Sequence, residues 1–232
     1  MEVKNYNEYI TSGDGINICD LCCEWPFRMS VVGPSGSGKT NMVVDMVLNH
    51  IYFDDIYVLA KDLEEPLYVF LKEKLESINE LIEQQDNNEI QKKGISFRSE
   101  LTLDVDALDK TKQSLIIIDD MVTNRDQRVA EELFIRGRKK NASTLYLSQS
   151  YFQIPKMIRL NSSYFAIFNI PNKRQLRSIA DTHSTRYEFK EFMAMFKEIH
   201  RTPYNFMLID NVTKIPQLHI RSGWDGISTC DY

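Results

Sequence analysis

The stretch RMSVVGPSGSGKTNMVVDMVLN, from Arg28 to Asn49, decides the fold of this chain. It begins with a short apolar run, Met29 to Val32, that is typical of a buried parallel strand. It ends in a segment whose Met and Val residues recur at helical spacing. The eight residues between fit G-x-x-x-x-G-K-[ST] at every fixed position: Gly33, Pro34, Ser35, Gly36, Ser37, Gly38, Lys39 and Thr40. A strand, a glycine-rich loop and a helix therefore follow one another as a phosphate-binding loop requires.

The chemistry of this loop favours the phosphates of a nucleotide. Gly33, Gly36 and Gly38 let the backbone curl so that successive N–H groups point into one concavity. The helix that follows adds the positive end of its dipole. Lys39 is expected to reach the β- and γ-phosphates of ATP, and the Thr40 hydroxyl to ligate Mg²⁺. A glycine-rich turn without a ligand is the alternative, and the flanking strand and helix argue against it.

The second chemical element is SLIIIDD, from Ser114 to Asp120. Four apolar residues followed by an acid are typical of a central strand whose carboxyl end meets the phosphates, the Walker B pattern. Asp119 is expected in the Mg²⁺ shell. Asp120 stands where related ATPases have a Glu that polarises the attacking water. The alternative is a strand that happens to end in an acidic turn, and the preceding glycine-rich loop makes this the weaker interpretation.

A third element, STLYLSQS, is an apolar strand from Ser143 that ends in polar residues. Gln149 at its end can hydrogen-bond the attacking water or the γ-phosphate, or it can be an ordinary residue of a surface turn. Before this strand, Arg125 to Lys140 has the pattern of a helix, with Gly137 as its expected terminator.

The remaining segments complete an α/β domain. Further strands are predicted at Ile56–Ala60, Ile95–Phe97, Tyr164–Asn169, Phe206–Asp210 and Leu218–Arg221, and helices at Pro66 to about Lys93 with a polar break after Gln84, at Ile154–Asn161, Asn172–Ala180 and Glu188–Ile199. This order is typical of a RecA-like ASCE sheet, mainly parallel, with strand order 5-1-4-3-2 and helices on both faces. We expect residues 1–24 to form an arm and residues 25–232 a single P-loop domain. Trp25 either packs at the edge of the core, which we favour, or stacks on adenine.

Composition is that of a soluble globular protein, with 43% hydrophobic and 26% charged residues. No apolar run approaches a membrane span, so we expect no transmembrane segment and a reducing interior. Cys19, Cys22, Cys23 and Cys230 are then expected to be free thiols. A zinc site at Cys19-x-x-Cys22 is the alternative, and it lacks a second pair of ligands.

The net charge of −5 does not describe the distribution of charge along the chain. From Leu133 to Ala180 there is no Asp or Glu. The basic residues of this window are Arg136, Arg138, Lys139, Lys140, Lys156, Arg159, Lys173, Arg174 and Arg177. An acidic protein can present a basic face to DNA in this way, although a charge run is more often only a solvated surface.

Three strings in this order, GPSGSGKT, IIIDDM and IRGRKKNASTLYLSQSYFQIPKMIRLN, together resemble the FtsK/HerA superfamily. Within it they are most similar to the genome-packaging ATPases of poxviruses, giant viruses, virophages and polintons. The resemblance runs from about Pro26 to Ile209. The first string is common to many P-loop proteins, whereas the last, in register after IIIDDM, is fairly specific.

The resemblance implies roles for single residues. Lys39 and Thr40 become the phosphate and metal residues, Asp119 the Mg²⁺ partner, Asp120 the catalytic acid and Gln149 the polar sensor. Many superfamily members have Glu where this chain has the shorter Asp120.

The resemblance also supplies a candidate for an arginine that acts in trans, Arg138, with Arg136 as the next choice. We expect the loop that carries both to lie at the carboxyl edge of the sheet, where a neighbouring subunit could receive it.

The implied function is a motor driven by ATP hydrolysis. Subunits would form a homo-oligomeric ring that moves double-stranded DNA through a basic pore into a preformed capsid, with largely sequence-independent contacts to DNA phosphates. The implied partners are double-stranded DNA, further copies of this chain and the capsid vertex. The implied location is the host cytoplasm or viral factory, or the virion.

A monomeric P-loop phosphotransferase or a nucleotide-dependent switch is the alternative. A guanine switch needs an NKxD-like element, and NKRQ from Asn172 to Gln175 lacks its acid. A small-molecule kinase usually places mobile Arg residues in a lid and has less need of a polar-ended strand after Walker B. DNA-stimulated hydrolysis by an oligomer separates the two hypotheses, and we favour the motor.

Overall fold

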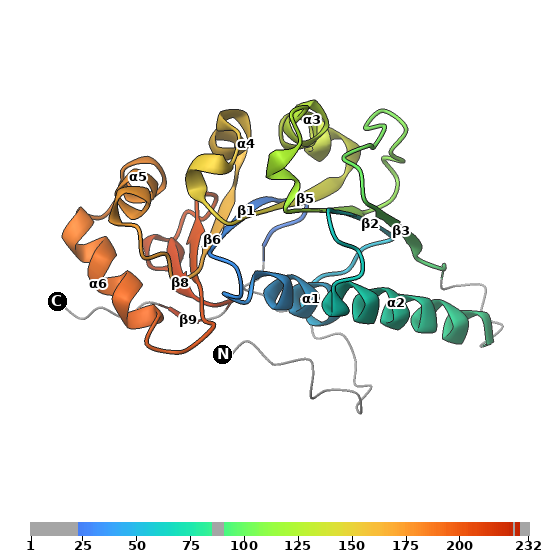
Figure 1. Ribbon diagram of the computed structural model, residues 1–232, viewed down its shortest axis with the longest axis horizontal. Helices are drawn as coiled ribbons and strands as arrows, with labels where there is room; N and C mark the ends of the chain where they lie inside the picture. The colour runs from blue at the N-terminus through green and yellow to red at the C-terminus, as the bar shows by residue number, and fades with distance from the viewer. Residues whose placement is uncertain (1–22, 85–90, 225, 228–232) are drawn as a thin grey trace.

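The protein is an α/β domain built on one large sheet. The computed structural model describes residues 23–84, 91–224 and 226–227 (Figure 1). Across these residues the strand order is β3-β2-β4-β5-β1-β6-β7-β8-β9. The strands are β1 (Arg28–Val32), β2 (Asp55–Ala60), β3 (Gly94–Arg98), β4 (Ser114–Asp119), β5 (Ala142–Ser148), β6 (Tyr164–Ile167), β7 (Met207–Asp210), β8 (Ile220–Ser222) and β9 (Gly226–Ile227).

The centre of this sheet has the expected topology. Strands β6-β1-β5-β4-β2 are mutually parallel and correspond to the order 5-1-4-3-2. The complete sheet differs because it is extended at both sides. β3 adds a parallel strand beside β2, and β7, β8 and β9 continue the sheet beyond β6 as antiparallel strands.

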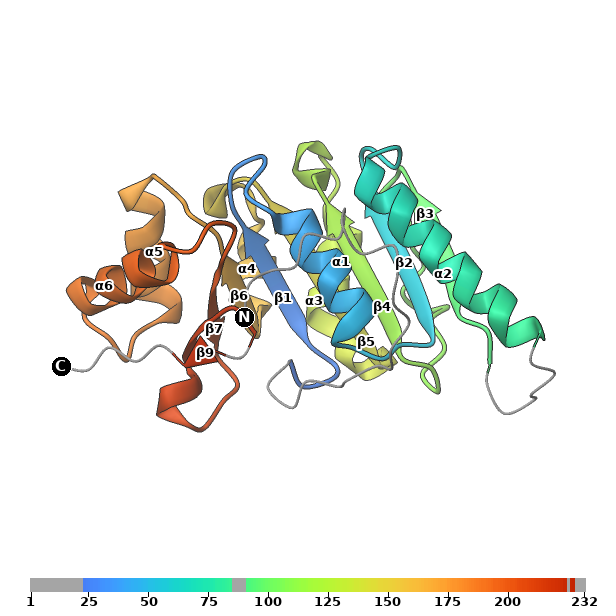
Figure 2. The same cartoon turned by 90° about the horizontal axis from the view of Figure 1, so that it is seen from below.

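Helices cover both faces of the sheet, as predicted. Figures 1 and 2 show α1 (Lys39–Asn49) and α2 (Pro66–Gln84) on one face, and α3 (Arg128–Arg136) and α4 (Lys156–Asn161) on the other. α5 (Lys173–His183) and α6 (Phe189–Ile199) lie toward the side of the antiparallel strands. Because helices shield both faces, the central strands are buried along almost their whole length and are rich in apolar residues.

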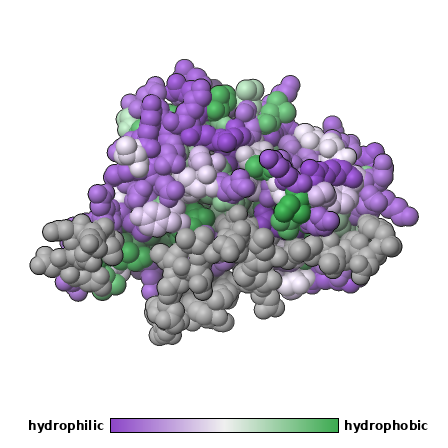
Figure 3. Space-filling model, turned by 180° about the vertical axis from the view of Figure 1, so that it is seen from behind, coloured by the Kyte–Doolittle hydropathy of each residue, from purple (hydrophilic) through white to green (hydrophobic). Residues whose placement is uncertain are grey.

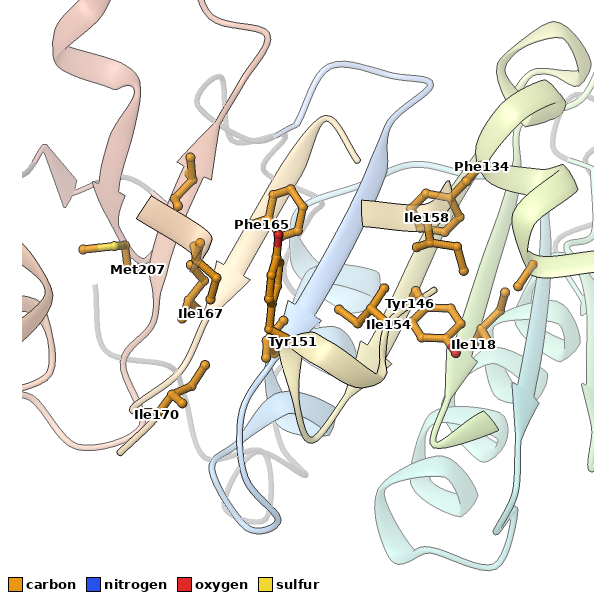
Figure 4. Close-up of a cluster of buried hydrophobic side chains, with 14 of the residues drawn as sticks. Ile118, Phe134, Tyr146, Tyr151, Ile154, Ile158, Phe165, Ile167, Ile170 and Met207 are labelled. Carbon is orange, nitrogen blue, oxygen red and sulfur yellow. The ribbon is translucent and has the colours of Figure 1, made fainter. Parts of the chain in front are cut away.

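Alternate residues of the strands fill two hydrophobic cores. Figure 4 shows the core under α3 and α4, where Phe134 and Ile158 of the helices meet Ile118 and Tyr146 of the strands. Met42 of α1 belongs to the second core on the opposite face. Period-two alternation in each strand thus fixes which residues face which helices. The surface seen from behind is mainly hydrophilic, with hydrophobic residues in small groups (Figure 3).

Several element boundaries differ from those predicted. The long helix after Pro66 ends at Gln84, and residues 91–93 are not helical. The last predicted strand begins at Ile220 because a 3-10 turn occupies Pro216–Leu218. No helix within the described ranges is both long and apolar enough to cross a bilayer.

The helix after Walker B does not end as predicted. α3 stops at Arg136, but Gly137 keeps a right-handed conformation (φ −54°) and begins a 3-10 turn that runs to Lys140. The residue that reverses the chain is Asn141, with φ +54°. Asn tolerates the left-handed region better than most residues, so it replaces glycine as the terminator here.

Candidate nucleotide-binding site

The glycine-rich loop connects β1 to α1 at the carboxyl edge of the parallel strands. Gly36 and Gly38 have φ values of +72° and +102°, which residues with a side chain rarely adopt. Gly33 has a different reason to be glycine, because a Cβ there would lie 2.6 Å from the Cβ of Phe168 on the neighbouring segment. The Gly33 N–H donates to the Ser148 carbonyl at 3.1 Å, which joins the loop to the end of β5.

Lys39 lies inside this loop. Its Nζ donates to the carbonyl oxygens of Gly33 at 2.8 Å and Pro34 at 3.0 Å. Partial burial lowers the pKa of Lys39, while the nearby carboxylates of Asp119 and Asp120 act in the opposite direction. The ammonium is therefore held by neutral carbonyl groups within the loop that would receive the phosphates.

An unsatisfied polar atom indicates that the loop fits a phosphate. The Ser37 Oγ is buried and has no hydrogen-bond partner among the described residues. A hydroxyl that is buried without a partner costs free energy, and a phosphate oxygen at the loop would accept its hydrogen bond. The loop, Lys39 and Thr40 therefore suit the phosphates of a nucleotide.

Asp119 ends β4 as a buried side chain beside the loop. Tyr68, a buried residue of α2, donates its hydroxyl to the Asp119 Oδ2 at 2.6 Å. Burial raises the pKa of Asp119, although the Tyr68 hydrogen bond and the Lys39 charge oppose that shift. Burial and the Asp119 charge raise the pKa of Tyr68, which remains a hydrogen-bond donor. With Thr40, this carboxylate offers the oxygen ligands that Mg²⁺ prefers.

Sequence analysis missed Tyr68 and a second residue, Glu65, which lies between β2 and α2. The half-buried Glu65 carboxylate receives a hydrogen bond from Thr40, which lowers its pKa, but burial and the charge of Asp119 outweigh this and raise it. Glu65 also contributes to the field around Lys39. The loop is thus bordered by more carboxylates than the Walker motifs contain.

Asp120 and Gln149 lie close together at the ends of adjacent strands. Asp120 has φ +51°, a left-handed conformation that turns the chain immediately after β4. Gln149 follows β5, and its Nε2 donates to the Asp120 Oδ1 at 3.5 Å. β4 and β5 are parallel neighbours, so this long contact joins two side chains at the carboxyl edge of the sheet.

The segment after Gln149 is tied to α5 by a residue that sequence analysis did not identify. The Gln175 Oε1 accepts hydrogen bonds from the Tyr151 N–H at 2.9 Å and the Ser150 hydroxyl at 3.2 Å. The Tyr151 hydroxyl shares a 2.9 Å hydrogen bond with His183, whose pKa burial lowers to about 4. The neutral His183 and Gln175 thus hold both ends of α5 against residues 149–153, named the sensor segment here for the role predicted for Gln149.

The Arg136–Arg138 segment lies at the amino edge, so the expected carboxyl-edge position is wrong. α3 begins after the carboxyl end of β4 and returns across the sheet, which brings its end beside the start of β5. There the Arg28 Nη1, at the start of β1, donates to the Phe134 carbonyl at 3.0 Å. Arg136 forms ion pairs with Asp106 and Glu132. Arg138 is exposed and has no ion pair within the part of the chain that is described.

The basic window is partly neutralised in space. Lys140 pairs with Asp106 at 3.4 Å, as Arg136 does. At the carboxyl edge, by contrast, Lys173 and Arg174 are exposed residues of the first turn of α5. The Arg174 guanidinium lies over the ring of Phe152, which follows the sensor strand. The exposed basic first turn of α5 therefore lies beside the segment that follows β5.

The structure describes one of the four cysteines, Cys23, and it describes Trp25. Cys19, Cys22 and Cys230 lie outside the described residues, and Cys23 is buried. Groups of three or more His, Cys, Asp or Glu residues arranged to hold a metal are absent from the described ranges. Trp25 donates from its Nε1 to the Asn141 Oδ1 at 2.9 Å and packs edge-on against Phe27. It therefore lies at the edge of the core at the amino side of the sheet, away from the loop.

The family model of the poxvirus A32 protein matches residues 20–215. The chain belongs to the poxvirus A32 family. The match covers most of the sequence and confirms the resemblance to viral genome-packaging ATPases of the FtsK/HerA type. This member of the A32 family is thus an ATPase with a P-loop at the carboxyl edge of its sheet. A search of curated proteins finds no match.

Solved structures confirm the fold of this A32-family chain. It is similar to the genome-packaging NTPase B204 of Sulfolobus turreted icosahedral virus 2 in complex with AMPPCP, with a TM-score of 0.54, 13% identity, and coverage of 87% of this chain and 98% of B204. B204 of Sulfolobus turreted icosahedral virus, the DNA-packaging ATPase, gives a TM-score of 0.53 and 13% identity over 88% of this chain and 100% of that one. At this identity the likeness concerns the fold alone.

Proposed function

We propose that this chain is an ATP-driven translocase of double-stranded DNA that packages a viral genome into a preformed capsid. The observation that carries the proposal is a continuous set of contacts at one edge of the sheet. It starts at the loop, where the Gly33 N–H donates to the Ser148 carbonyl, and follows the residues after β5 to Gln175 in the basic first turn of α5. Asp120 joins it through the hydrogen bond from Gln149. Family membership and the fold of the packaging ATPases support the same function.

In this proposal the nucleotide is ATP, and Lys39 and the backbone of residues 33–40 hold its phosphates. Thr40 and Asp119 hold Mg²⁺, which supplies charge neutralisation at the transferring phosphate. Tyr68 fixes the Asp119 carboxylate through its 2.6 Å hydrogen bond. The buried hydroxyl of Ser37 donates to a phosphate oxygen.

Asp120 is the proposed group that activates the attacking water, and Gln149 is the proposed sensor of the γ-phosphate. The contact between them is long, 3.5 Å, so either side chain can exchange it for a hydrogen bond to the water. A change at Gln149 would move Ser150 and Tyr151, the two residues that Gln175 binds. Gln175 would thereby connect the state of the nucleotide to α5.

The proposed oligomer is a ring in which Arg138 completes the site of a neighbouring subunit. Arg138 lies at the opposite edge of the sheet from its own loop, so it cannot serve that loop. It is exposed and carries no ion pair among the described residues, whereas Arg136 is held by Asp106 and Glu132. A planar guanidinium of this kind stabilises charge on a transferring phosphoryl group.

The proposed DNA contact is the basic cluster of α5, defined here as Lys173, Arg174 and Arg177. Lys173 and Arg174 have no ion pair in the described part of the chain, and Arg177 is shared between Asp181 and the ring of Phe189. These contacts would be to phosphates and independent of sequence. The capsid vertex as partner, and a place in the host cytoplasm, the viral factory or the virion, belong to the same proposal.

The test measures ATP hydrolysis and particle mass on one preparation, with and without double-stranded DNA. The expected result is an oligomer whose hydrolysis rate rises with DNA. Charge reversal of the α5 cluster to Glu should weaken DNA binding equally for unrelated sequences. It should also reduce the dependence of log affinity on log salt by up to about 0.9 for each DNA phosphate that the protein no longer neutralises.

The matched control is charge reversal of Lys72, Lys74 and Lys110, of which the first two lie on α2, on the other face of the sheet. This control changes the net charge equally and should leave the salt dependence unaltered. A monomer with DNA-independent hydrolysis would instead favour a phosphotransferase or a switch. An equal change of slope in both variants would exclude α5 as the DNA contact.

A further inference from the structure

A cavity adjoins the phosphate-binding loop on the side away from Asp119 and Asp120. It has a volume of about 290 Å³. Its wall is formed by the loop from Pro34 to Ser37, by Phe168 and Asn169 after β6, and by the connection between α6 and β7, which contributes His200 and residues 202–205. None of these segments outside the loop carries a motif, so the cavity could not be seen in the sequence.

The position of the cavity relative to the loop suggests what it binds. β1, which carries the loop, lies between β5 and β6. Asp119, Asp120 and Gln149 are on the β5 side, where the terminal phosphate would react, and the cavity is on the β6 side. A nucleoside triphosphate is a linear molecule with phosphates at one end and a base at the other. A molecule with its terminal phosphate near Asp119 would therefore direct its nucleoside toward the cavity.

We infer that this cavity binds the nucleobase and that Tyr204 stacks on it. Tyr204 is 65% exposed, the highest value among the exposed large hydrophobic residues of the described ranges. Its backbone has φ +60°, which costs free energy in a residue other than Gly, Asn or Asp. Its Cβ and Cδ1 atoms approach within 3.5–3.6 Å of the point where a Cβ on Gly38 would lie. The strained backbone thus holds an exposed aromatic ring against the loop.

Two polar side chains of the cavity, His200 and Asn205, are already engaged and hold its shape. Both ring nitrogens of His200 lie within hydrogen-bond distance of carbonyls, those of Phe196 at 2.6 Å and Ile167 at 3.1 Å. The Asn205 amide donates to the Ile199 carbonyl and the Ser222 hydroxyl, and its oxygen accepts from a backbone N–H. These side chains therefore have little capacity left to recognise a base.

Asn169 differs from them. It is exposed, and its side chain makes no hydrogen bond within the described residues. One uncommitted amide beside one aromatic ring predicts that stacking supplies most of the affinity for the base. Every base has a π-face, so discrimination among bases should be modest, with purines preferred for their larger stacking area.

This inference rests on the proposed binding of ATP at the loop. The experiment distinguishes failure of base binding at the cavity from failure of phosphate binding at the loop. Binding of ATP and of inorganic tripolyphosphate, both with Mg²⁺, is measured by titration calorimetry for the full chain. The variants are Tyr204→Asn, which removes the ring but suits a left-handed backbone, and Tyr204→Phe, which keeps the ring. Tyr204→Asn should weaken ATP binding by about 10- to 100-fold and leave tripolyphosphate binding unchanged. Tyr204→Phe should bind both as the parent does.

Tyr52→Ala is the matched control, because Tyr52 is 51% exposed and precedes β2 at the amino edge of the sheet. It should bind both compounds normally. An equal loss of ATP and tripolyphosphate in Tyr204→Asn would mean that Tyr204 supports the loop and not the base, and unchanged ATP binding would place the base elsewhere. Either result overturns the inference while the loop's function stands. If the parent protein binds neither compound, the proposed nucleotide site fails as well.

Discussion

The two edges of the parallel sheet differ in how their charges are paired. At the amino edge, Arg136 and Lys140 share Asp106, and Arg136 also pairs with Glu132. At the carboxyl edge, Lys39 has only carbonyl oxygens as hydrogen-bond partners in the described structure, and Asp119 is buried against a tyrosine hydroxyl. Arg136 and Lys140 at the amino edge are thus paired within the subunit, whereas the carboxyl edge is arranged for charges that a ligand would bring.

Arg138 is an exception to this difference between the two edges. It lies at the paired edge and is itself unpaired within the described residues. In a ring of identical subunits, the amino edge of one subunit can face the carboxyl edge of the next. The comparison therefore predicts that the unpaired charges at the two edges belong to one composite site.

The largest expected effect comes from breaking this composite site with Arg138→Ala. The assembled oligomer should bind ATP normally, and its hydrolysis should fall by about 10³- to 10⁵-fold, the range measured for arginine fingers. The measurement is steady-state hydrolysis together with nucleotide affinity. Arg136→Ala is the control, because Arg136 is already paired with Asp106 and Glu132 and should retain most of the activity.

Mixing variants sharpens the same prediction. Arg138→Ala subunits should suppress hydrolysis in neighbouring wild-type subunits. Mixed with Lys39→Ala subunits, they should recover partial activity, because some interfaces pair an intact loop with an intact arginine. Normal hydrolysis by assembled Arg138→Ala protein would remove Arg138 from the site and leave Arg136 as the next candidate.

The next largest effect is expected within the carboxyl edge, from Asp120→Asn. Asp119 and its bond to Tyr68 survive this change, so ATP should still bind, while hydrolysis should fall by about 10²- to 10⁴-fold as expected for loss of a general base. Lys39→Ala, which removes the ammonium from the loop, should instead abolish binding itself. Turnover by Asp120→Asn at the parental rate would show that Asp120 does not activate the water.

A smaller effect is expected from Gln175→Ala, which removes the connection between the sensor segment and α5. Basal hydrolysis should change little, because Gln175 makes no hydrogen bond to the loop, Asp120 or Gln149 in the described structure. The stimulation of hydrolysis by DNA should fall by about 5- to 150-fold or be abolished, within the usual range of coupling between sites. Gln153→Ala, which truncates an exposed glutamine of the same sensor segment, is the control. Equal loss of basal and stimulated rates in Gln175→Ala would point to a structural role.

The smallest expected effect concerns stability without nucleotide. Burial raises the pKa of Asp119, so the folded state favours the neutral carboxyl more than the unfolded state does. As the pH rises above the ordinary value of about 3.9, the unfolded chain releases its proton first and stability falls until the raised pKa is passed.

Asp119→Asn cannot ionise, and its amide oxygen can still accept from Tyr68. The variant should therefore melt a few degrees above the parent at pH 7, with an advantage that shrinks as the pH falls toward 4. Thermal melts across this range measure it. With Mg²⁺ and ATP the order should reverse, since the variant loses the metal ligand. A variant less stable than the parent at pH 7 without ligand would show that Asp119 contributes to folding at this edge.

The sequence predicted those parts of the site that lie within one local segment. Gly33 to Thr40 and the Asp119–Asp120 pair are contiguous, so their strand and helix context was visible, and the core strand order followed from it. Gln149 was found because a polar residue ended an apolar strand. Strands after β6 were predicted, but their antiparallel pairing beside β6 was not, because the parallel core does not determine how later strands pair at its edge.

Tyr68, Glu65 and Gln175 were missed for a shared reason. Each is an ordinary residue in its own segment and acquires its role from a partner far away in the sequence, Asp119 for Tyr68 and Ser150 and Tyr151 for Gln175. The edge of the sheet on which Arg138 lies was predicted wrongly, although the order of strands and helices along the chain determines it. A helix that follows one parallel strand must return to the start of the next, which places its end at the amino edge.

The central claim is that hydrolysis at the carboxyl edge moves double-stranded DNA. The most direct measurement is displacement of a third DNA strand from a duplex of arbitrary sequence by the purified oligomer with ATP and Mg²⁺. We expect displacement that requires hydrolysis, stops with Asp120→Asn and does not depend on the sequence of the duplex. ATP hydrolysis that proceeds at the same rate with and without duplex, and with no strand displaced, would contradict this claim.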